Sequence, residues 1–309
     1  MKKRLLTGIV LLSIIGIFFG LRQFNVYLFD ILIGVILVCG SAEISRVFIR
    51  SKHYNNMTLA TMFPILYYLG FVVSMQKGFS FGFFVLTEVC LLVVMVLITF
   101  LWTILDRKTY NAEIGDVKPS KYVAKKVFLT AFIMVYPTFL LGNMFILNHT
   151  MALNWFNSLF NSNLGLFLLL TLFAITMSTD TMAYLVGSLL KGPKLCPYIS
   201  PKKTISGAVG GLLGGIISSI VAFIIVNNIE VFNTFFVTHN INIWAFVLLG
   251  FIGPIFTQIG DIFASWLKRK ALTKDFSSIF PGHGGFMDRC DGLSFSAVVM
   301  LVFSLIVFA

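Results

Sequence analysis

Long apolar runs alternate with short polar connections along the whole chain. Nine of these runs are long enough to be interpreted as membrane spans. They cover residues 5–20, 24–44, 57–74, 80–105, 124–147, 163–190, 205–227, 241–267 and 292–309. A helix needs about 20 predominantly apolar residues to cross a bilayer. The pattern therefore predicts an all-α fold, a polytopic bundle of about nine transmembrane helices.

The first run follows a basic start, Met1–Arg4, and has the length of a signal peptide. No small-x-small cleavage site follows it, so we interpret it as an uncleaved first span. We expect one continuous membrane domain, in which residues 1–150 form the N-terminal spans and residues 151–309 form the C-terminal spans with their cytoplasmic loops.

The placement of lysine and arginine orients the predicted bundle. With the N-terminus inside, 21 of the 23 lysines and arginines fall on that side, and only Arg22 and Lys77 fall outside. Basic residues accumulate in the cytoplasmic connections of membrane proteins. The split therefore predicts a multi-pass protein of the cell membrane. Its N-terminus is expected in the cytoplasm, its C-terminus outside, and its polar chemistry on the cytoplasmic face.

Composition agrees with this assignment. The chain is 58% hydrophobic and 11% charged, whereas soluble domains are about a quarter charged. A net charge of +11 is compatible with nucleic acid binding. The basic residues of the predicted cytoplasmic connections already account for this charge, so we expect no nucleic acid partner. The four cysteines form no CxxC pair, which argues against a zinc site or a disulfide framework. Cys196 and Cys290 are expected as cytoplasmic thiols.

One stretch, Ser265–Asp291, interrupts the apolar pattern with basic residues, carboxylates and glycines around His283. Glycines beside the histidine allow the backbone to approach a ligand closely. Asp288 and Asp291 can share one side of a helical turn, where a divalent cation could be held. The neighbouring lysines and arginines would repel a bare cation but suit a metal–polyphosphate ligand. The alternative is a solvated basic loop.

Three further segments carry polar residues beside the predicted spans. Asp180 lies deep in the sixth run and needs a water-filled cavity, a cation or a structural partner. The segment Ser200–Gly207 combines lysines and hydroxyls at a helix start, which suits a phosphate, although it also reads as a basic flank with a proline turn. Asp261 shares a helix face with residues one and two turns later, which are Ser265, Lys268 and Arg269.

Other features have simpler interpretations. Glycines recur at three- and four-residue spacing from Gly207 to Gly215, and we interpret them as helix packing positions rather than a nucleotide loop. Glu43 lies near the end of the second run and is expected at the membrane interface, while Glu88 lies deeper and is expected to be protonated or paired. The lysines within Asn111–Lys126 are expected near anionic head groups.

Together the polar motifs resemble the signature of the phosphatidate cytidylyltransferases (CDP-diacylglycerol synthases). The match is close in the C-terminal half and extends to the N-terminal spans only in pattern. In register with that family stand Ser265, Leu267, Lys268, Arg269, Lys274, Asp275, Pro281, His283, Gly284, Gly285, Phe286, Asp288, Arg289 and Asp291. Three upstream motifs also match, through Asp180, Ala183, Tyr184, Gly187, through Ser200, Pro201, Lys202, Lys203, Thr204, and through Gly260 and Asp261 before Ser265. The chain departs from the family at Ile205, Ser206, Ala264 and Cys290, so two family acids are absent.

The resemblance implies transfer of the cytidylyl group of CTP to phosphatidate, with Mg²⁺ as cofactor and catalysis in the C-terminal spans. The implied metal ligands are Asp261 and Asp288, supported by Asp180 and Asp291. The implied catalytic residues are Asp180, Lys203, Lys268, Arg269, His283, Asp288 and Arg289. The implied substrate-binding residues are Ser200, Lys202, Lys203, Thr204, Ser265, Lys274, His283, Gly284 and Gly285.

Two other functions remain open at this point. A CTP-dependent polyprenol or dolichol kinase would need a base for a neutral alcohol and should lack the complete HGGxxDRxD ending. An ion-coupled transporter would use the buried aspartates, but paired broken helices at mid-membrane are missing from the pattern. Membrane lipids are expected partners, and a homodimer is left open. A lipid phosphate substrate also predicts a cavity among the sixth to eighth spans, open to the cytoplasm and to the bilayer.

Overall fold

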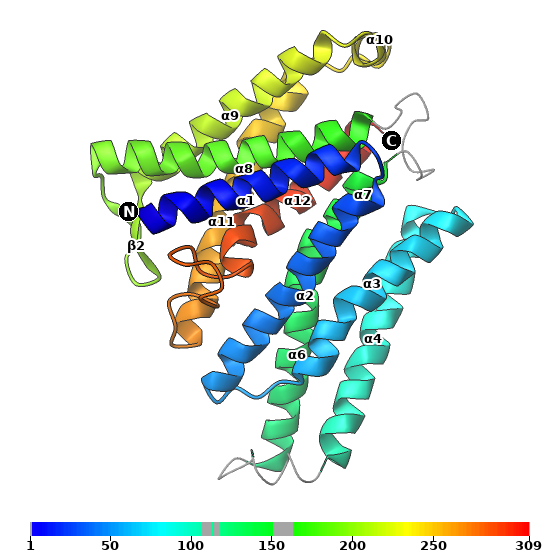
Figure 1. Cartoon of the computed structure of the whole chain (residues 1–309), viewed down its shortest axis with the longest axis vertical. Coiled ribbons are helices and arrows are strands. Elements are labelled where there is room, and N and C mark those ends of the chain that lie inside the picture. Colours follow the sequence, from blue (N-terminus) through cyan, green and yellow to red (C-terminus); the bar gives the residue numbers. More distant parts are fainter. Residues whose placement is uncertain (1, 107–112, 114–117, 151–162, 309) are drawn as a thin grey trace. The chain divides into compact units, whose positions relative to one another are not determined.

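The computed structural model of the chain describes residues 2–106, 113, 118–150 and 163–308, most of which are helical (Figure 1). The basic residues Arg107 and Lys108, positions 111, 112 and 114–117 of the segment expected at the interface, and the connection 151–162 lie outside the described residues. The chain divides into two compact units. Unit 1 comprises Met1–Phe145 and Lys270–Arg289, and unit 2 comprises Ile146–Arg269 and Cys290–Ala309.

Eight helices in the described part of the chain are long and apolar enough to cross a membrane. The predicted polytopic helical bundle is therefore confirmed, and the chain is a multi-pass membrane protein. The first run forms α1 (Lys2–Arg22), which is not among these eight. The ninth span and the orientation of the termini stay predictions.

Unit 1 contains α1, α2 (Tyr27–Arg50), α3 (Met57–Lys77), α4 (Phe81–Leu105) and α6 (Pro119–Leu141), and α7 (Asn143–Asn148) straddles its boundary with unit 2. Helix α3 packs against α2, α4 and α6 (Figure 1). Part of the core is a cluster of Phe63, Met95 and Met134, one from each of α3, α4 and α6. Buried apolar side chains from three helices thus meet in this part of the core.

Unit 2 is built on α8 (Asn163–Leu190), α9 (Ile205–Asn227), α10 (Glu230–Thr238) and α11 (Ile243–Lys270), with most of α12 (Met287–Val307). Helices α8 and α9 lie side by side (Figure 1). A Cβ atom on Gly207 would come within 2.7 Å of the Ala183 carbonyl oxygen, and one on Gly214 within 2.8 Å of the Ser178 carbonyl oxygen. The prediction that these glycines serve helix packing is confirmed.

The helix ends differ from the apolar runs at two informative places. Helix α2 continues to Arg50, six residues beyond the second run, because its last turns pack inside unit 1 through Val47 and Phe48. Helix α12 begins at Met287, so Asp288 and Asp291 are both helical, as the predicted shared turn requires. Hydropathy locates spans, but polar residues at span ends hide the helix boundary.

Candidate active site

Unit 2 contains a cavity of about 650 Å³ lined by α8, α9, α11 and the segment between α8 and α9. Its charged lining consists of four lysines and two aspartates, which are Lys191, Lys194, Lys202, Lys203, Asp180 and Asp261. The expected cavity among the sixth to eighth spans is therefore present, and its opening to the bilayer stays a prediction. Excess positive charge in a concave site suits a polyanionic ligand.

A short β-hairpin presents the lysines of this cavity. Strand β1 (Lys194–Cys196) pairs antiparallel with β2 (Ser200–Thr204), with Lys194 opposite Thr204. Thr204 is also the N-cap of α9, and its Oγ1 accepts a hydrogen bond from the Gly207 amide at 3.1 Å. A threonine at this position satisfies one of the unpaired amides at a helix start. The hairpin and cap together fix Lys202 and Lys203 at the rim of the cavity.

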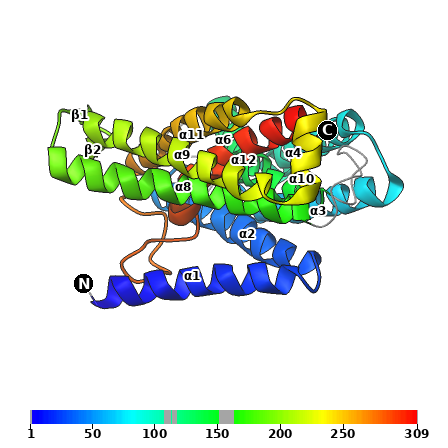
Figure 2. The same ribbon diagram turned by 90° about the horizontal axis from the view of Figure 1, so that it is seen from above.

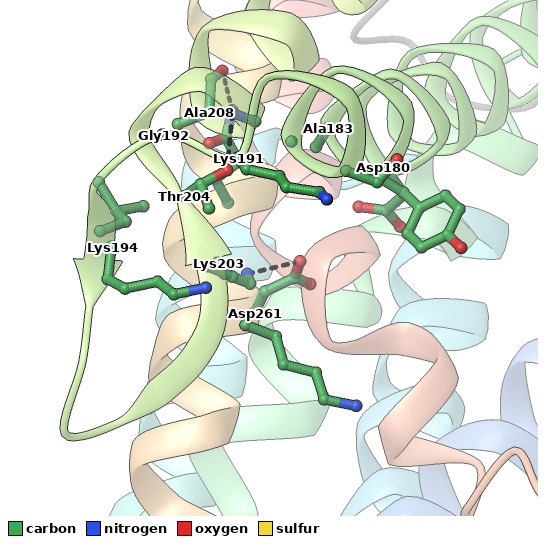
Figure 3. Close-up of a pocket in the computed structure, with 16 residues that line it drawn as sticks. Asp180, Ala183, Lys191, Gly192, Lys194, Lys203, Thr204, Ala208 and Asp261 are labelled. Atoms are coloured by element: carbon green, nitrogen blue, oxygen red, sulfur yellow. Dashed lines mark hydrogen bonds and ion pairs between the residues drawn. The ribbon is translucent and has the colours of Figure 1, made fainter.

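Lys203 and Asp261 form an ion pair across the cavity. The Lys203 Nζ lies 2.9 Å from the Asp261 Oδ2, and both side chains remain partly exposed (Figure 3). Lys191 and Lys194 extend into the same space, and Asp180 faces it from α8 (Figure 3). Because exposed pairs of this kind contribute at most about 1 kcal/mol to stability, the pair is better suited to binding and charge placement than to holding the fold.

A second set of predicted residues lies where α11 approaches α12. The Lys268 Nζ lies 3.8 Å from the Asp291 Oδ2, and Asp291 interacts electrostatically with Asp261 and Asp180. A Cβ atom on Gly260 would come within 2.5 Å of the Asp291 carbonyl oxygen, so the two helices touch here. Three of the four predicted aspartates therefore belong to one charged region of unit 2.

The remaining unit 2 residues sit around this region. Arg269 donates from Nε to the Ile199 carbonyl oxygen at 3.3 Å, which ties the end of α11 to the hairpin turn. Ser200 opens β2 and is paired with Cys196. Ser265 lies one turn after Asp261 and does not line the cavity. Of the predicted unit 2 residues, those that line the cavity are Asp180, Lys202, Lys203, Thr204 and Asp261.

The His-Gly-Gly motif forms a compact loop in unit 1. The Phe280 carbonyl oxygen accepts from the His283 amide at 2.9 Å, with Pro281 and Gly282 between them and a Gly282 φ of 79°. Proline followed by a residue of positive φ defines a type II turn, which favours glycine at the second central position. The motif therefore fixes the position of the His283 backbone.

Helix α1 contacts this loop. The Thr7 Oγ1 lies 2.6 Å from the His283 Nδ1 and 3.3 Å from the Pro281 carbonyl oxygen. Figure 2 shows the loop before α12 reaching α1. His283 is thus oriented by a residue from the first helix, a contact that the C-terminal motif alone does not reveal.

Two buried carboxylates hold the loop and the start of α12. The Asp288 Oδ2 accepts from the Phe276 amide at 2.8 Å and from the Gly285 amide at 2.9 Å. Glu43 accepts from the Ser277 Oγ at 2.7 Å and from the Phe286 and Met287 amides at 3.0 Å each. Glu43 is 1% exposed. The expectation that Glu43 is exposed at the end of its span is therefore wrong, because α2 continues past it and its carboxylate is buried against the loop.

The side chains of Lys274, before the His-Gly-Gly loop, and Arg289, in the first turn of α12, are exposed. Lys274 lines a cavity in unit 1, about 520 Å³ in volume, together with Arg50, Asp275 and Ser277.

Gly284 has a φ of 81°, and a Cβ atom there would lie 2.6 Å from the Asp288 Oδ2. Glycine is therefore required at Gly284 both by the backbone angle and by the close carboxylate.

The predicted magnesium ligands remain a hypothesis. Among the described residues, no three His, Cys, Asp or Glu side chains form a group that could hold a metal ion. Mg²⁺ is commonly bound by one or two carboxylates together with substrate phosphates. The pair of carboxylates that faces the cavity, Asp180 and Asp261, fits that smaller requirement. The proposal that Asp261 and Asp288 share one ion stays a prediction.

Sequence reasoning missed Lys191, Lys194 and Gln258, which also line the cavity, and the positioning role of Glu43. Lys191 and Lys194 lie in a connection whose basic charge the predicted topology already explains. Gln258 donates from Nε2 to the Ala208 carbonyl oxygen at 3.2 Å, which links α11 to α9. No local pattern marked Glu43, because its partners lie 234 or more residues away.

The family model described as "Cytidylyltransferase family" matches residues 2–307. The chain belongs to the cytidylyltransferase family. The N-terminal spans, which resembled it only in pattern, are included in the match. Within this family member, Ser206 takes the place of one acid of the resemblance, and its Oγ lies 3.2 Å from the Thr204 Oγ1 beside the helix cap. Ala264, in place of the other, is fully buried.

Curated relatives match the chain over part of its length. The phosphatidate cytidylyltransferase of Staphylococcus haemolyticus (strain JCSC1435) is 42% identical over 131 residues, which cover 42% of this chain and 46% of the relative. That of Brucella abortus biovar 1 (strain 9-941) is 37% identical over 135 residues, 44% of this chain and 46% of the relative. That of Staphylococcus aureus (strain COL) is 38% identical over 131 residues, 42% of this chain and 46% of the relative. The matched stretch spans about half the length of these relatives.

Proposed function

We propose that this family member transfers the cytidylyl group of CTP to phosphatidate, giving CDP-diacylglycerol and pyrophosphate for phospholipid synthesis. The observation that carries the proposal is the unit 2 cavity, where four lysines and two aspartates face one space beside membrane-spanning helices. Relatives that match the chain are named phosphatidate cytidylyltransferases. The family match gives no support to the transporter or polyprenol kinase alternatives.

The reaction needs positioning more than acid–base chemistry. A phosphate oxygen of phosphatidate attacks the α-phosphorus of CTP, and the bond from that phosphorus to the bridging oxygen of the β-phosphate breaks. Pyrophosphate leaves with the electron pair. The attacking oxygen is already anionic, so no strong general base is required. Lys202 and Lys203, with Lys191 and Lys194, are placed to bind and orient the triphosphate and to offset its charge.

Mg²⁺ is the cofactor we propose, with Asp180 and Asp261 as the residues of the cavity that would hold it. When bound, it would neutralise charge on the triphosphate and on the leaving pyrophosphate. Lys203 pairs with the Asp261 Oδ2 at 2.9 Å. A cation–phosphate ligand would replace this pair, with the cation on the carboxylate and a phosphate on the lysine. We further propose Asp288 and Asp291 as ligands of the cation. Lys268, Arg269 and His283 would bind phosphates.

The proposed enzyme works at the cytoplasmic face of the cell membrane. The four lysines of the cavity all belong to the connection between α8 and α9, which the distribution of basic residues assigns to the cytoplasm. The apolar helices beside the cavity would let phosphatidate keep its acyl chains in the bilayer while its head group reaches the aspartates. We keep a homodimer as a proposal.

The orientation is checked by thiol labelling of intact cells. In a variant whose only cysteine is the half-buried Cys196, a membrane-impermeant reagent is expected to label the protein only after permeabilisation. Cys290 is buried and is unsuitable for the same assay. A matched protein with Lys77→Cys as its only cysteine should be labelled from outside. Labelling of Cys196 in intact cells would contradict the proposed orientation.

The activity is checked by pyrophosphate release from the purified full chain. We expect release only when CTP, phosphatidate and Mg²⁺ are all present, with CDP-diacylglycerol formed in equal amount. Replacing phosphatidate by a polyprenol tests the kinase alternative, which would yield CDP and a lipid phosphate instead. Product formation from the alcohol, or no turnover with phosphatidate, would contradict the proposed reaction.

A further inference from the structure

We propose that unit 1 carries a separate phosphate-binding site for the head group of an anionic phospholipid. The site is a pocket of about 480 Å³ where the connection after α2 meets the start of α6. It is lined by Lys52, Tyr54, Glu113, Lys118, Lys121, Tyr122, Lys125 and Lys126. The proposed transfer reaction uses none of these residues. The inference rests on the pocket and not on that reaction.

The floor of the pocket is a built polar network. Lys126 is buried, and its Nζ lies 2.9 Å from the Glu113 Oε2 and 2.9 Å from the Tyr122 hydroxyl oxygen. The Tyr122 hydroxyl donates to the same Glu113 oxygen at 2.5 Å. Within the described part of the chain, Glu113 is the one carboxylate that lines the pocket. It is already engaged with Lys126, and Asp106 is the other described carboxylate near enough to act electrostatically on Tyr122. The lysines that line the pocket thus outnumber the described carboxylates beside it.

Four lysines surround this floor with their side chains exposed: Lys52, Lys118, Lys121 and Lys125. Lys118, the N-cap of α6, and Lys121 and Lys125 in its first turns follow a spacing of three and four residues, which places them on one side of the helix start. Like charges at this spacing repel one another. Their positions also oppose the helix dipole, because the N-terminal end of a helix favours anions and the first turn of α6 holds no acidic residue. A bound anion would relieve both unfavourable terms.

Lys52 completes the cluster from a different element. It follows the end of α2 with a φ of 56°, a left-handed conformation that usually falls to glycine at this position. The Tyr54 and Tyr122 rings lie 6.4 Å apart beside the lysines. Lysines together with tyrosines at the ends of membrane-spanning helices are typical of residues that contact lipid head groups. This location favours a lipid phosphate over a soluble one.

The test measures binding of phosphatidylglycerol to the purified full chain in detergent by native mass spectrometry. Phosphatidylglycerol is neither substrate nor product of the proposed reaction, so the result is independent of that reaction. We expect the double variant Lys121→Gln/Lys125→Gln to weaken binding by at least about tenfold, and Lys52→Gln by about fivefold. The first variant alters exposed side chains of one helix and the second alters another element, so a folding defect in one leaves the other informative.

The matched control is Lys2→Gln/Lys3→Gln, which removes the same charge from the side of the membrane predicted for the pocket. It should keep phosphatidylglycerol affinity within about twofold. Phosphatidylcholine, a zwitterionic lipid, should bind wild type and variants alike, and millimolar inorganic phosphate should not displace phosphatidylglycerol. Unchanged affinity in the pocket variants would overturn the site. Displacement by inorganic phosphate would overturn the lipid assignment.

Discussion

The Asp261→Asn variant is expected to lose about 10²–10³-fold in turnover while keeping its fold. Asp261 lines the unit 2 cavity, and its Oδ2 forms the ion pair with Lys203 at 2.9 Å. Asparagine keeps the shape of the side chain but removes the charge that would meet a cation bound to the triphosphate. The loss corresponds to roughly 3–4 kcal/mol of transition-state stabilisation. A partly exposed ion pair contributes about 0–1 kcal/mol to stability, so unfolding should change little.

The measurement compares initial rates of pyrophosphate release with thermal unfolding of the same preparations. Glu230→Gln removes an exposed carboxylate on α10 and serves as the matched control, with normal turnover expected. Lys203→Gln, alone and combined with Asp261→Asn, separates two roles. If Asp261 merely held Lys203 in place, the double variant would be no slower than Lys203→Gln alone. Near-normal turnover of Asp261→Asn would remove Asp261 from the proposed site.

How much of this molecule follows from the sequence depends on how local each interaction is. Membrane helices are predictable because twenty apolar residues have few alternatives in a bilayer. Most of the cavity lysines and aspartates are predictable: Lys202, Lys203 and Asp261 stand near span ends on one predicted side, and Asp180 is a carboxylate inside a span. Charge placement and hydropathy are enough to gather those residues.

Other features depend on contacts that no local pattern encodes. The hairpin consists of strands of only three and five residues, too short and too polar for an alternating pattern to be recognised. Thr7 and His283 are 276 residues apart, and their contact depends on how α1 lies within unit 1. Asp288 was expected as a metal ligand, but its acceptance of two loop amides became visible only in the folded loop.

Glu43 also makes contacts that no local pattern encodes, and we expect its substitution to have the second large effect. Removing its carboxylate with Glu43→Ala would leave the Ser277 hydroxyl and the Phe286 and Met287 amides without their acceptor in a buried site. Each such donor costs about 1–3 kcal/mol. We therefore expect the variant to lose at least about 3 kcal/mol of stability, with a fall in unfolding temperature of the order of 5–10 °C.

Turnover of Glu43→Ala should also fall, by at least about tenfold, at temperatures where the variant is still folded. The reason is geometric, because Glu43 fixes the start of α12 and the loop that carries His283 and Asp288. Glu43→Gln keeps one acceptor oxygen in nearly the same shape and should recover part of both losses. Unfolding temperature and turnover are measured on each variant in the same detergent.

The matched control is Glu88→Gln, which alters another carboxylate of unit 1 that is also 1% exposed. The Glu88 Oε2 has no hydrogen-bond partner among the described residues. Replacing it should therefore cost little, because it deprives no buried donor of an acceptor. If Glu43→Ala and Glu88→Gln reduced stability and turnover equally, burial alone would explain the effect of Glu43. A selective loss in Glu43→Ala that Glu43→Gln partly restores would identify its three hydrogen bonds as the cause.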